Sequence, residues 1–196
     1  MALQVPDEAL ALILDAEGLD QPSQWPGGAS GITIGVGYDL GFATADQFEE
    51  DWSPFLSTDE IERLKDVIGL SGDKASQRAS EFRDIKIKRA DAEQVFKERT
   101  LPLYSQRTEA AFPGVDQLPA AAQGALVSLV FNRGAGMNGD SRREMRAVRD
   151  AVAEGNLQEI ADQIRSMKRL WEGKNLGGLL KRRDAEADLV ESAIEN

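Results

Sequence analysis

The sequence predicts an α+β protein that is mainly helical, with a small N-terminal β lobe and a C-terminal helical bundle. Three observations carry this prediction. Apolar residues recur at helical spacing before Gly18 and again after about residue 44, and residues typical of helix ends occur in both regions. Between Gly18 and Gly41 the helical period is absent and glycine alternates with β-branched residues. The length of 196 residues suits a single domain over 1–196, with 1–60 forming the first helix and the β lobe and 61–196 forming the helical part.

The first helix is expected to begin at Pro6 and Asp7 and to end near Glu17. Its apolar face carries Leu10, Ile13 and Leu14, and Gly18 ends it. The following QPSQWPGGASG is rich in turn-forming residues, and ITIGVGY is typical of a short strand or hairpin.

Helical signals then return. Thr44 and Gln47 have the spacing of a capping box, and Thr58 is predicted to cap the next helix. A long helix is expected from Asp91 to Ala111, kinked or divided by Pro102.

The second half is predicted to be helical throughout. Pro119 opens AAAQGALVSLVF, which is apolar on all sides and is therefore expected to be a buried central helix. Asp140 or Ser141 should cap the next helix, Asn156 the one after it, and the last helix should start near Gly177.

The composition restricts the chemistry. The chain has no cysteine, which excludes disulfides, zinc–thiolate sites and thiol nucleophiles. It has no histidine, which excludes the Ser-His-Asp triad and the usual proton shuttle near neutral pH. Proton transfer therefore falls to carboxylates, lysine or tyrosine, and no cofactor is implied.

The charge is unevenly distributed. Residues 1–60 carry twelve acidic side chains and no basic one, whereas 61–196 carry 22 acidic and 23 basic side chains. This balance disfavours nucleic acid as a partner, and the acidic excess also fits a plain solubility surface. The N-terminus lacks a signal-peptide pattern and no apolar run is long enough to span a membrane, so we expect a chain made in the cytoplasm that has no membrane partner.

Three segments carry the candidate chemistry. A glutamate ends the first helix in Asp15–Gly18, a glycine-rich strand follows at Gly31–Gly41, and Gly178–Glu186 lies near the C-terminus. Cleavage of a glycosidic bond needs one carboxylic acid to protonate the leaving oxygen and usually a second carboxylate. Partial burial would raise the pKa of the glutamate, strand glycines would let a sugar chain approach the backbone, and a threonine hydroxyl could hold the water.

The run from Glu17 to Gly41 resembles the active-site segment of phage-type lysozymes, glycoside hydrolase family 24. These have a glutamate on the first helix and a T-x-G-x-G strand about fifteen residues later. Gln123–Gly134 and Gly178–Glu186 resemble further blocks of the family, whereas 43–115 carry no recognised motif. The resemblance implies a two-lobed lysozyme-like fold and hydrolysis, with inversion, of the β-1,4 bond between N-acetylmuramic acid and N-acetylglucosamine in peptidoglycan.

One position departs from the usual family pattern. Most phage lysozymes have Asp or Cys six residues before the threonine, where this chain has Gly27. The bacteriocin pesticin instead has its aspartate six residues after the threonine, and Asp39 stands six after Thr33. The pesticin-like resemblance therefore implies that Glu17 is the general acid and that Asp39 and Thr33 activate water. Asp20 is the rival second carboxylate, although its position favours a loop cap.

Each of the three candidate catalytic residues also fits a purely structural role. Glu17 could be a solvated helix-end residue, Thr33 a plain strand residue and Asp39 a turn cap. Gly35-x-Gly37 is not a dinucleotide fingerprint, because the chain continues as strand and turn rather than entering a helix.

Four residues of the two later blocks have open or structural roles. Arg182 and Arg183 point about 100° apart on a helix, so one is expected at the surface. The other should form a structural salt bridge with Glu186 or reach the end of the first helix. Phe131 and Asn132 fit either the core or the floor of a cleft.

The alternative to an enzyme is a non-catalytic peptidoglycan-binding or phage structural module that kept the fold. An endolysin and a secreted toxin domain share the chemistry, and a toxin would have an immunity protein as a partner. We expect a monomer that reaches the periplasmic cell wall after release or export by another system.

Overall fold

The computed structural model describes residues 3–194 and has the predicted fold class. The chain is 62% helical and contains a small two-stranded sheet, as expected for a mainly helical α+β lysozyme-like fold. The chain forms two compact units, one of residues 1–16 and 102–196 and the other of residues 17–101. These units divide the chain after residues 16 and 101. The prediction of one domain over 1–196, with its two parts meeting at residue 60, stays a prediction.

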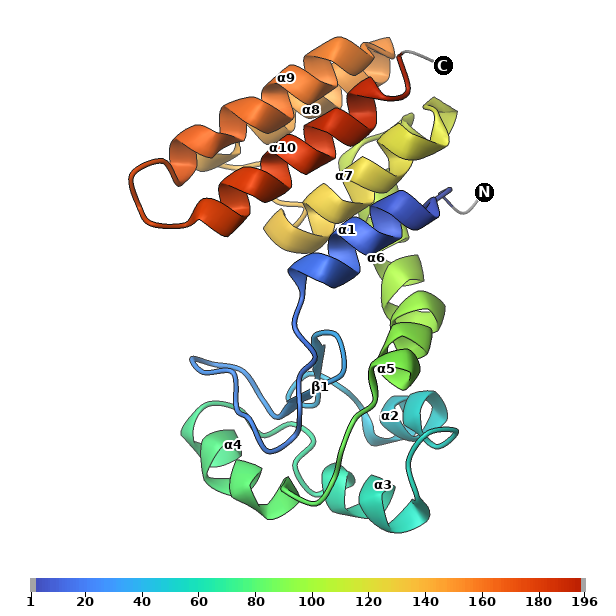
Figure 1. Cartoon of the computed structure of the whole chain (residues 1–196), viewed down its shortest axis with the longest axis vertical. Helices are drawn as coiled ribbons and strands as arrows, with labels where there is room; N and C mark the ends of the chain where they lie inside the picture. Colours follow the sequence, from blue (N-terminus) through green and yellow to red (C-terminus); the bar gives the residue numbers. More distant parts are fainter. Residues whose placement is uncertain (1–2, 195–196) are drawn as a thin grey trace. The chain divides into compact units, whose positions relative to one another are not determined.

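The first unit is a helical bundle. Its helices are α1 (Asp7–Ala16), α6 (Leu101–Ala111), α7 (Ala120–Arg133), α8 (Arg143–Glu154), α9 (Leu157–Ser166) and α10 (Gly177–Glu191). Short 3₁₀ turns cover Val115–Gln117, Asp140–Arg142 and Met167–Leu170. In Figure 1, α7 lies between α1 and α10, and α9 lies beside both α8 and α10.

The central helix α7 is buried as predicted. Every residue from Ala122 to Val130 is buried, because α1 and α10 pack against it. Gly124 allows the closest approach: a Cβ atom there would lie 2.4 Å from Cβ of Ala9 and 3.0 Å from Cδ of Pro6. A glycine at this position therefore sets how tightly α1 packs on the core.

The second unit holds a β-hairpin and short helices. The strands are β1 (Thr33–Ile34) and β2 (Tyr38–Asp39), and the helices are α2 (Ala45–Trp52), α3 (Thr58–Lys65), α4 (Asp73–Arg78) and α5 (Arg89–Val95). A 3₁₀ turn at Ala79–Phe82 follows α4, and a π-helical segment at Phe96–Thr100 follows α5. Its core contains large side chains with at most 1% exposure: Ile32, Ile34, Leu40, Phe48, Trp52, Leu64, Phe82, Ile85 and Phe96.

Most predicted element boundaries are confirmed. The first helix ends at Ala16, ITIGVGY forms the hairpin, and the last helix begins at Gly177. Asn156 caps α9, accepting a hydrogen bond from N of Glu159 at 3.1 Å.

Three predicted caps differ from the structure. The cap of α3 is Ser57 rather than Thr58, since Ser57 and Glu60 form a complete capping box. The Thr44 box is half formed, because Gln47 donates its side-chain amide to Asp51 instead of returning to the cap. Neither Asp140 nor Ser141 caps α8, because both lie in the 3₁₀ turn before it.

The long helix predicted for Asp91–Ala111 begins at Arg89 and is interrupted before Pro102. The interruption is the π-helical segment Phe96–Thr100. Proline has no N–H to continue the α-helical ladder, so a local change of helix type just before it has a physical cause. Across residues 3–194, no helix combines the length and apolar character that a membrane span requires.

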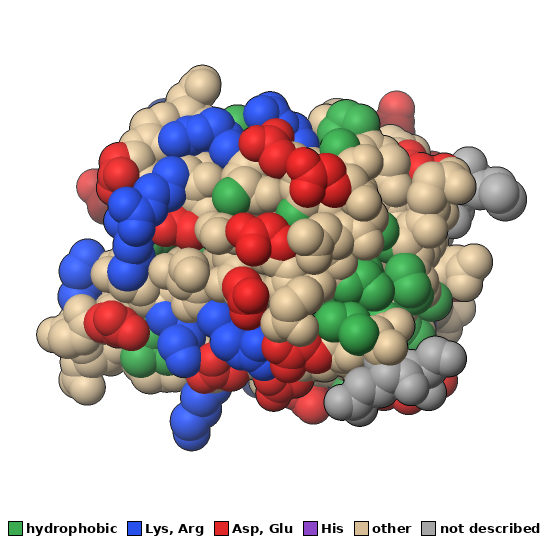
Figure 2. Space-filling view, turned by 90° about the horizontal axis from the view of Figure 1, so that it is seen from above, with side chains coloured by type: hydrophobic (Ala, Val, Ile, Leu, Met, Phe, Trp, Pro, Cys, Tyr) green, Lys and Arg blue, Asp and Glu red, His purple; other side chains and the backbone are tan. Residues whose placement is uncertain are grey.

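Charged side chains of both signs share the surface. Figure 2 shows acidic and basic side chains interspersed on one face of the molecule. Many of them form exposed ion pairs, such as that between Arg63 and Asp84 at 2.6 Å, which lowers the pKa of the Asp84 carboxyl to about 2. Exposed pairs of this kind contribute little to stability.

Candidate active site

The β-hairpin brings two of the predicted site residues directly opposite each other. Strands β1 and β2 are antiparallel, and Thr33 pairs with Asp39. The N–H of Leu40 donates to the carbonyl of Ile32 at 2.9 Å, so Thr33 and Asp39 form a non-hydrogen-bonded pair. Side chains in such pairs point to the same face of the sheet and lie close together. The six-residue separation in sequence thus becomes direct adjacency.

The carboxylate of Asp39 is fixed by backbone donors. Its Oδ1 accepts from N of Gly31 at 3.0 Å and from N of Gly41 at 2.8 Å, and its Oδ2 accepts from N of Gly31 at 3.2 Å. These bonds hold the ends of the hairpin together and orient the carboxylate. Asp39 is half-buried, so the bonds leave it partly accessible to solvent.

Thr33 is a buried strand residue with 6% exposure. Its hydroxyl donates to the carbonyl of Gly31 at 3.4 Å, which is long for a hydrogen bond between oxygen atoms. A weakly held hydroxyl beside a carboxylate is suited to exchange its partner for a water molecule.

Asp20 anchors the turn of the hairpin, as its predicted role of loop cap requires. Its backbone exchanges two hydrogen bonds with Gly35, at 2.8 and 3.0 Å, and its Oδ2 accepts from N of Gly37 at 3.2 Å. Burial raises the pKa of Asp20; the hydrogen bond from Gly37 opposes this shift, and the negative charges of Glu17 and Asp39 add to it.

Glu17 lies directly after the last residue of α1 and is half-buried. Its charge acts on Asp20, and the charge of Asp39 acts on Asp20 as well. The carboxylates of Glu17 and Asp39 therefore both raise the pKa of the same neighbour, Asp20. The wider distance expected for an inverting enzyme, between the carboxyl groups of Glu17 and Asp39, stays a prediction.

Two of the strand glycines have packing roles, and the predicted role of admitting a sugar chain stays a prediction. A Cβ on Gly31 would lie 2.5 Å from Oδ1 of Asp39 and 2.4 Å from N of Gly41. A Cβ on Gly35 would lie 2.9 Å from the Trp52 ring, and this residue has a φ of +64°. Gly37 alone of these three has open space around its Cβ position, at the exposed turn.

A polar network that the sequence analysis missed supports strand β2. The hydroxyl of Tyr38 donates to Oδ2 of Asp51 at 2.9 Å, and Nε of Arg99 pairs with Oδ1 of the same carboxylate at 2.5 Å. Burial and the bond to Asp51 raise the pKa of Tyr38. The Tyr38 ring also packs edge-on against Trp52, with 5.8 Å between centroids. Since Tyr38 adjoins Asp39, these contacts fix the strand that carries the candidate base.

Both arginines of the C-terminal block are buried, so the prediction that one lies at the surface is wrong. Arg182 is 5% exposed, and Arg183 and Glu186 are fully buried. The predicted salt bridge to Glu186 is confirmed, and both arginines take part in it: Nε of Arg183 lies 2.8 Å from Oε2 and Nε of Arg182 lies 3.3 Å from Oε1.

Helix α7 supplies further partners to this buried pair. The hydroxyl of Ser128 donates to Oε1 of Glu186 at 2.7 Å, and Oδ1 of Asn132 accepts from Nη2 of Arg183 at 3.1 Å. Burial opposes the charged form of both partners, since it raises the pKa of Glu186 and lowers that of Arg183. Asn132 thus contacts the buried network, and the half-buried Phe131 packs edge-on against Tyr104 at 4.7 Å.

Comparison with protein families gives one match. Residues 67–186 match the family described as phage lysozyme, and this match covers more than half of the chain. The second and third sequence blocks lie inside the matched segment, whereas Glu17, Thr33 and Asp39 lie before it. A search of curated proteins found no match.

Proposed function

Because the chain belongs to the phage lysozyme family, we propose that it is a muramidase that cleaves peptidoglycan with inversion. Membership of the family implies a glycoside hydrolase with lysozyme activity and peptidoglycan as its substrate. The proposal adds the bond, between N-acetylmuramic acid and N-acetylglucosamine, and the residues that act on it.

The observation that carries the proposal is the direct pairing of Thr33 with Asp39 across the hairpin. A carboxylate and a hydroxyl on the same face can hold one water molecule between them. The sequence brings Glu17 to the segment that precedes this hairpin, and its charge acts on the neighbouring Asp20. The lobe therefore contains the two carboxyl groups that glycoside hydrolysis needs.

In the proposed mechanism, Glu17 donates its proton to the leaving glycosidic oxygen. Asp39 accepts a proton from the water that attacks the opposite face of the sugar, and Thr33 orients that water. An inverting arrangement requires about 6.5–9.5 Å between the carboxyl groups of Glu17 and Asp39, to leave room for the water. No metal or cofactor takes part in these steps.

The decisive experiment is digestion of purified peptidoglycan followed by mass spectrometry of the muropeptides. Products with a reducing N-acetylmuramic acid end support the proposed bond, and NMR of the fresh products should show the α-anomer first. Products with a reducing N-acetylglucosamine end, or no products at all, would contradict the proposal; the latter would favour a non-catalytic wall-binding module.

A matched variant tests the general acid. Glu17→Gln keeps the side-chain shape but cannot donate the proton, so turnover should fall at least ~100-fold. Thermal melting of the variant shows whether it is folded under the assay conditions, so that a loss of turnover can be separated from unfolding. A normally folded Glu17→Gln protein with near wild-type turnover would remove Glu17 from the mechanism.

We also propose that the enzyme reaches the periplasmic wall after release or export by another system, and that it acts as a monomer. A holin encoded beside it would indicate an endolysin, and an immunity protein would indicate a toxin.

A further inference from the structure

A group of arginines gathers around Trp171 in the helical unit of residues 1–16 and 102–196. Arg133, the last residue of α7, places its guanidinium carbon 4.8 Å from the centroid of a Trp171 ring. Arg183 on α10 places its own 5.7 Å from the same residue's ring. Arg142 follows Ser141, whose carbonyl accepts a hydrogen bond from Nη2 of Arg133 at 2.7 Å, so the turn before α8 brings Arg142 beside Arg133. We call Arg133, Arg142 and Arg183, with Trp171, the arginine cluster.

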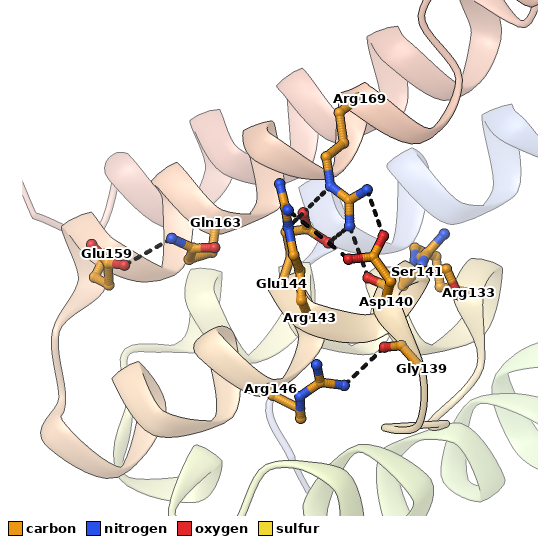
Figure 3. Close-up of polar contacts among 10 residues, drawn as sticks. All are labelled: Arg133, Gly139, Asp140, Ser141, Arg143, Glu144, Arg146, Glu159, Gln163 and Arg169. Atoms are coloured by element: carbon orange, nitrogen blue, oxygen red, sulfur yellow. Dashed lines mark hydrogen bonds and ion pairs between the residues drawn. The ribbon is translucent and has the colours of Figure 1, made fainter.

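The nearby acids are already engaged by other arginines. Figure 3 shows Glu144 held by Arg143 and Arg169, and Asp140 held by Arg169. In the part of the chain that the structure describes, neither Arg133 nor Arg142 forms an ion pair with an acidic side chain. Arg133 instead donates from Nη2 to the carbonyl of Ser141 at 2.7 Å.

The local charge is consequently unbalanced. Within residues 3–194, the three arginines of the cluster form one ion pair with an acid, that of Arg183 with Glu186, so the positive charges of Arg133 and Arg142 give an excess of two. The C-terminal end of α7, where Arg133 lies, offsets only about half a charge. Burial, followed by the charges of Arg142 and Arg183, lowers the pKa of Arg133 to about 10.

Four guanidinium nitrogens of the cluster are buried without a hydrogen-bond partner in the described part of the chain; one of them, Nε of Arg183, lies 2.8 Å from Oε2 of Glu186 in an ion pair, and the other three have no such contact. These three are Nε of Arg133, Nη1 of Arg142 and Nη1 of Arg183. Arg183 is fully buried, whereas Arg133 and Arg142 are half-buried and so have access to solvent. Buried donors without partners carry a free-energy cost that a bound acceptor would relieve.

We propose that Arg133, Arg142 and Arg183 form a binding site for a tetrahedral oxyanion of the phosphate class, next to Trp171. Guanidinium groups match the oxygen geometry of phosphate, and unpartnered donors on three separate side chains suit a tetrahedral anion better than a planar carboxylate. A dianion also neutralises more of this positive excess than a monoanion does. The ligand is either free phosphate or a phosphoryl group of a larger molecule.

Isothermal titration calorimetry of the full chain with inorganic phosphate tests the site, at fixed ionic strength in chloride. We expect saturable binding by the wild type and an affinity at least ~10-fold lower in Arg142→Gln and Arg133→Gln, as for loss of a charged hydrogen bond. Arg149→Gln is the matched control: Arg149 is half-buried on α8, like Arg133 and Arg142, and pairs with Asp150 at 3.6 Å. It should bind phosphate like the wild type.

Two further ligands identify the chemistry and its source. Glutarate offers carboxylates only, and binding of glutarate as tight as that of phosphate would contradict the phosphate-class assignment. A soluble poly(glycerol phosphate) that competes with phosphate would identify a polymer as the source; failure to compete would identify the free anion.

Equal phosphate affinity in the wild type and in Arg142→Gln would overturn the proposal, as would the absence of saturable binding. Arg142→Gln is the decisive variant because Arg142 takes part in no ion pair among the described residues, so its loss should leave folding intact. Thermal melting without phosphate checks this. Glu17→Gln should bind phosphate normally, so the outcome is independent of the proposed catalytic activity.

Discussion

Replacement of Asp39 by asparagine separates its catalytic role from its structural role. The carboxylate accepts hydrogen bonds from N of Gly31 and N of Gly41, so an alanine would remove the acceptor of both donors. Each unsatisfied backbone N–H costs about 1–3 kcal/mol, which predicts a loss of about 2–6 kcal/mol in unfolding free energy. At about 2–4 °C per kcal/mol, Asp39→Ala should melt roughly 4–24 °C lower, and its inactivity alone would be ambiguous.

Asparagine keeps the oxygen that matters most for the fold. Oδ1 of Asp39 makes both shorter bonds, at 2.8 and 3.0 Å, and the amide oxygen of asparagine can occupy the same position. The charge contribution, about 1 kcal/mol for each of two bonds, is lost, and the amide nitrogen at the Oδ2 position no longer accepts the weaker bond of 3.2 Å from N of Gly31. Asp39→Asn should therefore melt only about 4–8 °C below the wild type. Without a proton acceptor, its kcat should fall at least ~100-fold with little change in KM.

The assay is peptidoglycan turnover measured beside thermal melting, at a temperature where wild type and variant are both folded. A folded Asp39→Asn protein with near wild-type kcat would refute the mechanism and leave Asp39 as a turn-stabilising residue only. Water activation would then have to come from the loop that precedes Thr33.

Three further predictions test the surrounding electrostatics. Asp20→Asn should keep near wild-type turnover. Because the pKa of Asp20 is raised in the folded protein, the wild type should lose stability as pH rises from about 3.8 through the raised pKa. Melting temperatures of the variant, measured over the same pH range, should lack this loss. Glu186→Gln removes the charge that pairs with the fully buried Arg183 and should cost about 3–5 kcal/mol, seen as a melting temperature about 6–20 °C lower. Activity should be highest at mildly acidic pH. Salt added from near zero should first increase the activity, because it screens the repulsion between the acidic N-terminal segment and the anionic cell wall. A rate that only falls as salt is added would contradict this prediction.

The helices could be predicted from the sequence because their signals are local. Apolar spacing and terminal residues fix where α1, α7 and α10 lie. The cap of α3 was misassigned for a reason visible in the sequence. Ser57 and Glu60 have the S-x-x-E spacing, and Ser57 adopts the extended conformation that a cap needs.

The buried polar groups could not be predicted, because their partners are distant in sequence. Adjacent residues Arg182 and Arg183 point in different directions, yet α7 and α9 both pack on α10, so both arginines are covered. The bond from Ser128 to Glu186 spans 58 residues. Periodicity alone does not report such contacts, and the same holds for the link between Tyr38 and Asp51.

The candidate site differs from the buried polar groups because its two paired residues, Thr33 and Asp39, are close in sequence. Their adjacency nevertheless depends on the register of the hairpin. A shift of one residue would move Thr33 and Asp39 to opposite faces, and the pairing of Asp20 with Gly35 and Gly37 helps to prevent that shift. The motif spacing therefore predicted adjacency only together with the turn glycines.

The two oxygens of Asp39 differ in the hydrogen bonds that they accept. Oδ1 makes the two shorter bonds, to Gly31 and Gly41, whereas Oδ2 makes a single longer one of 3.2 Å. In the proposed mechanism Oδ2 is therefore the oxygen that accepts the proton from water, since it gives up the weaker interaction. The hydroxyl of Thr33, held at 3.4 Å by Gly31, likewise exchanges a weak bond for the same water. A carboxylate fixed through one oxygen and available through the other is preorganised for the reaction, so the fold and the chemistry depend on the same hairpin.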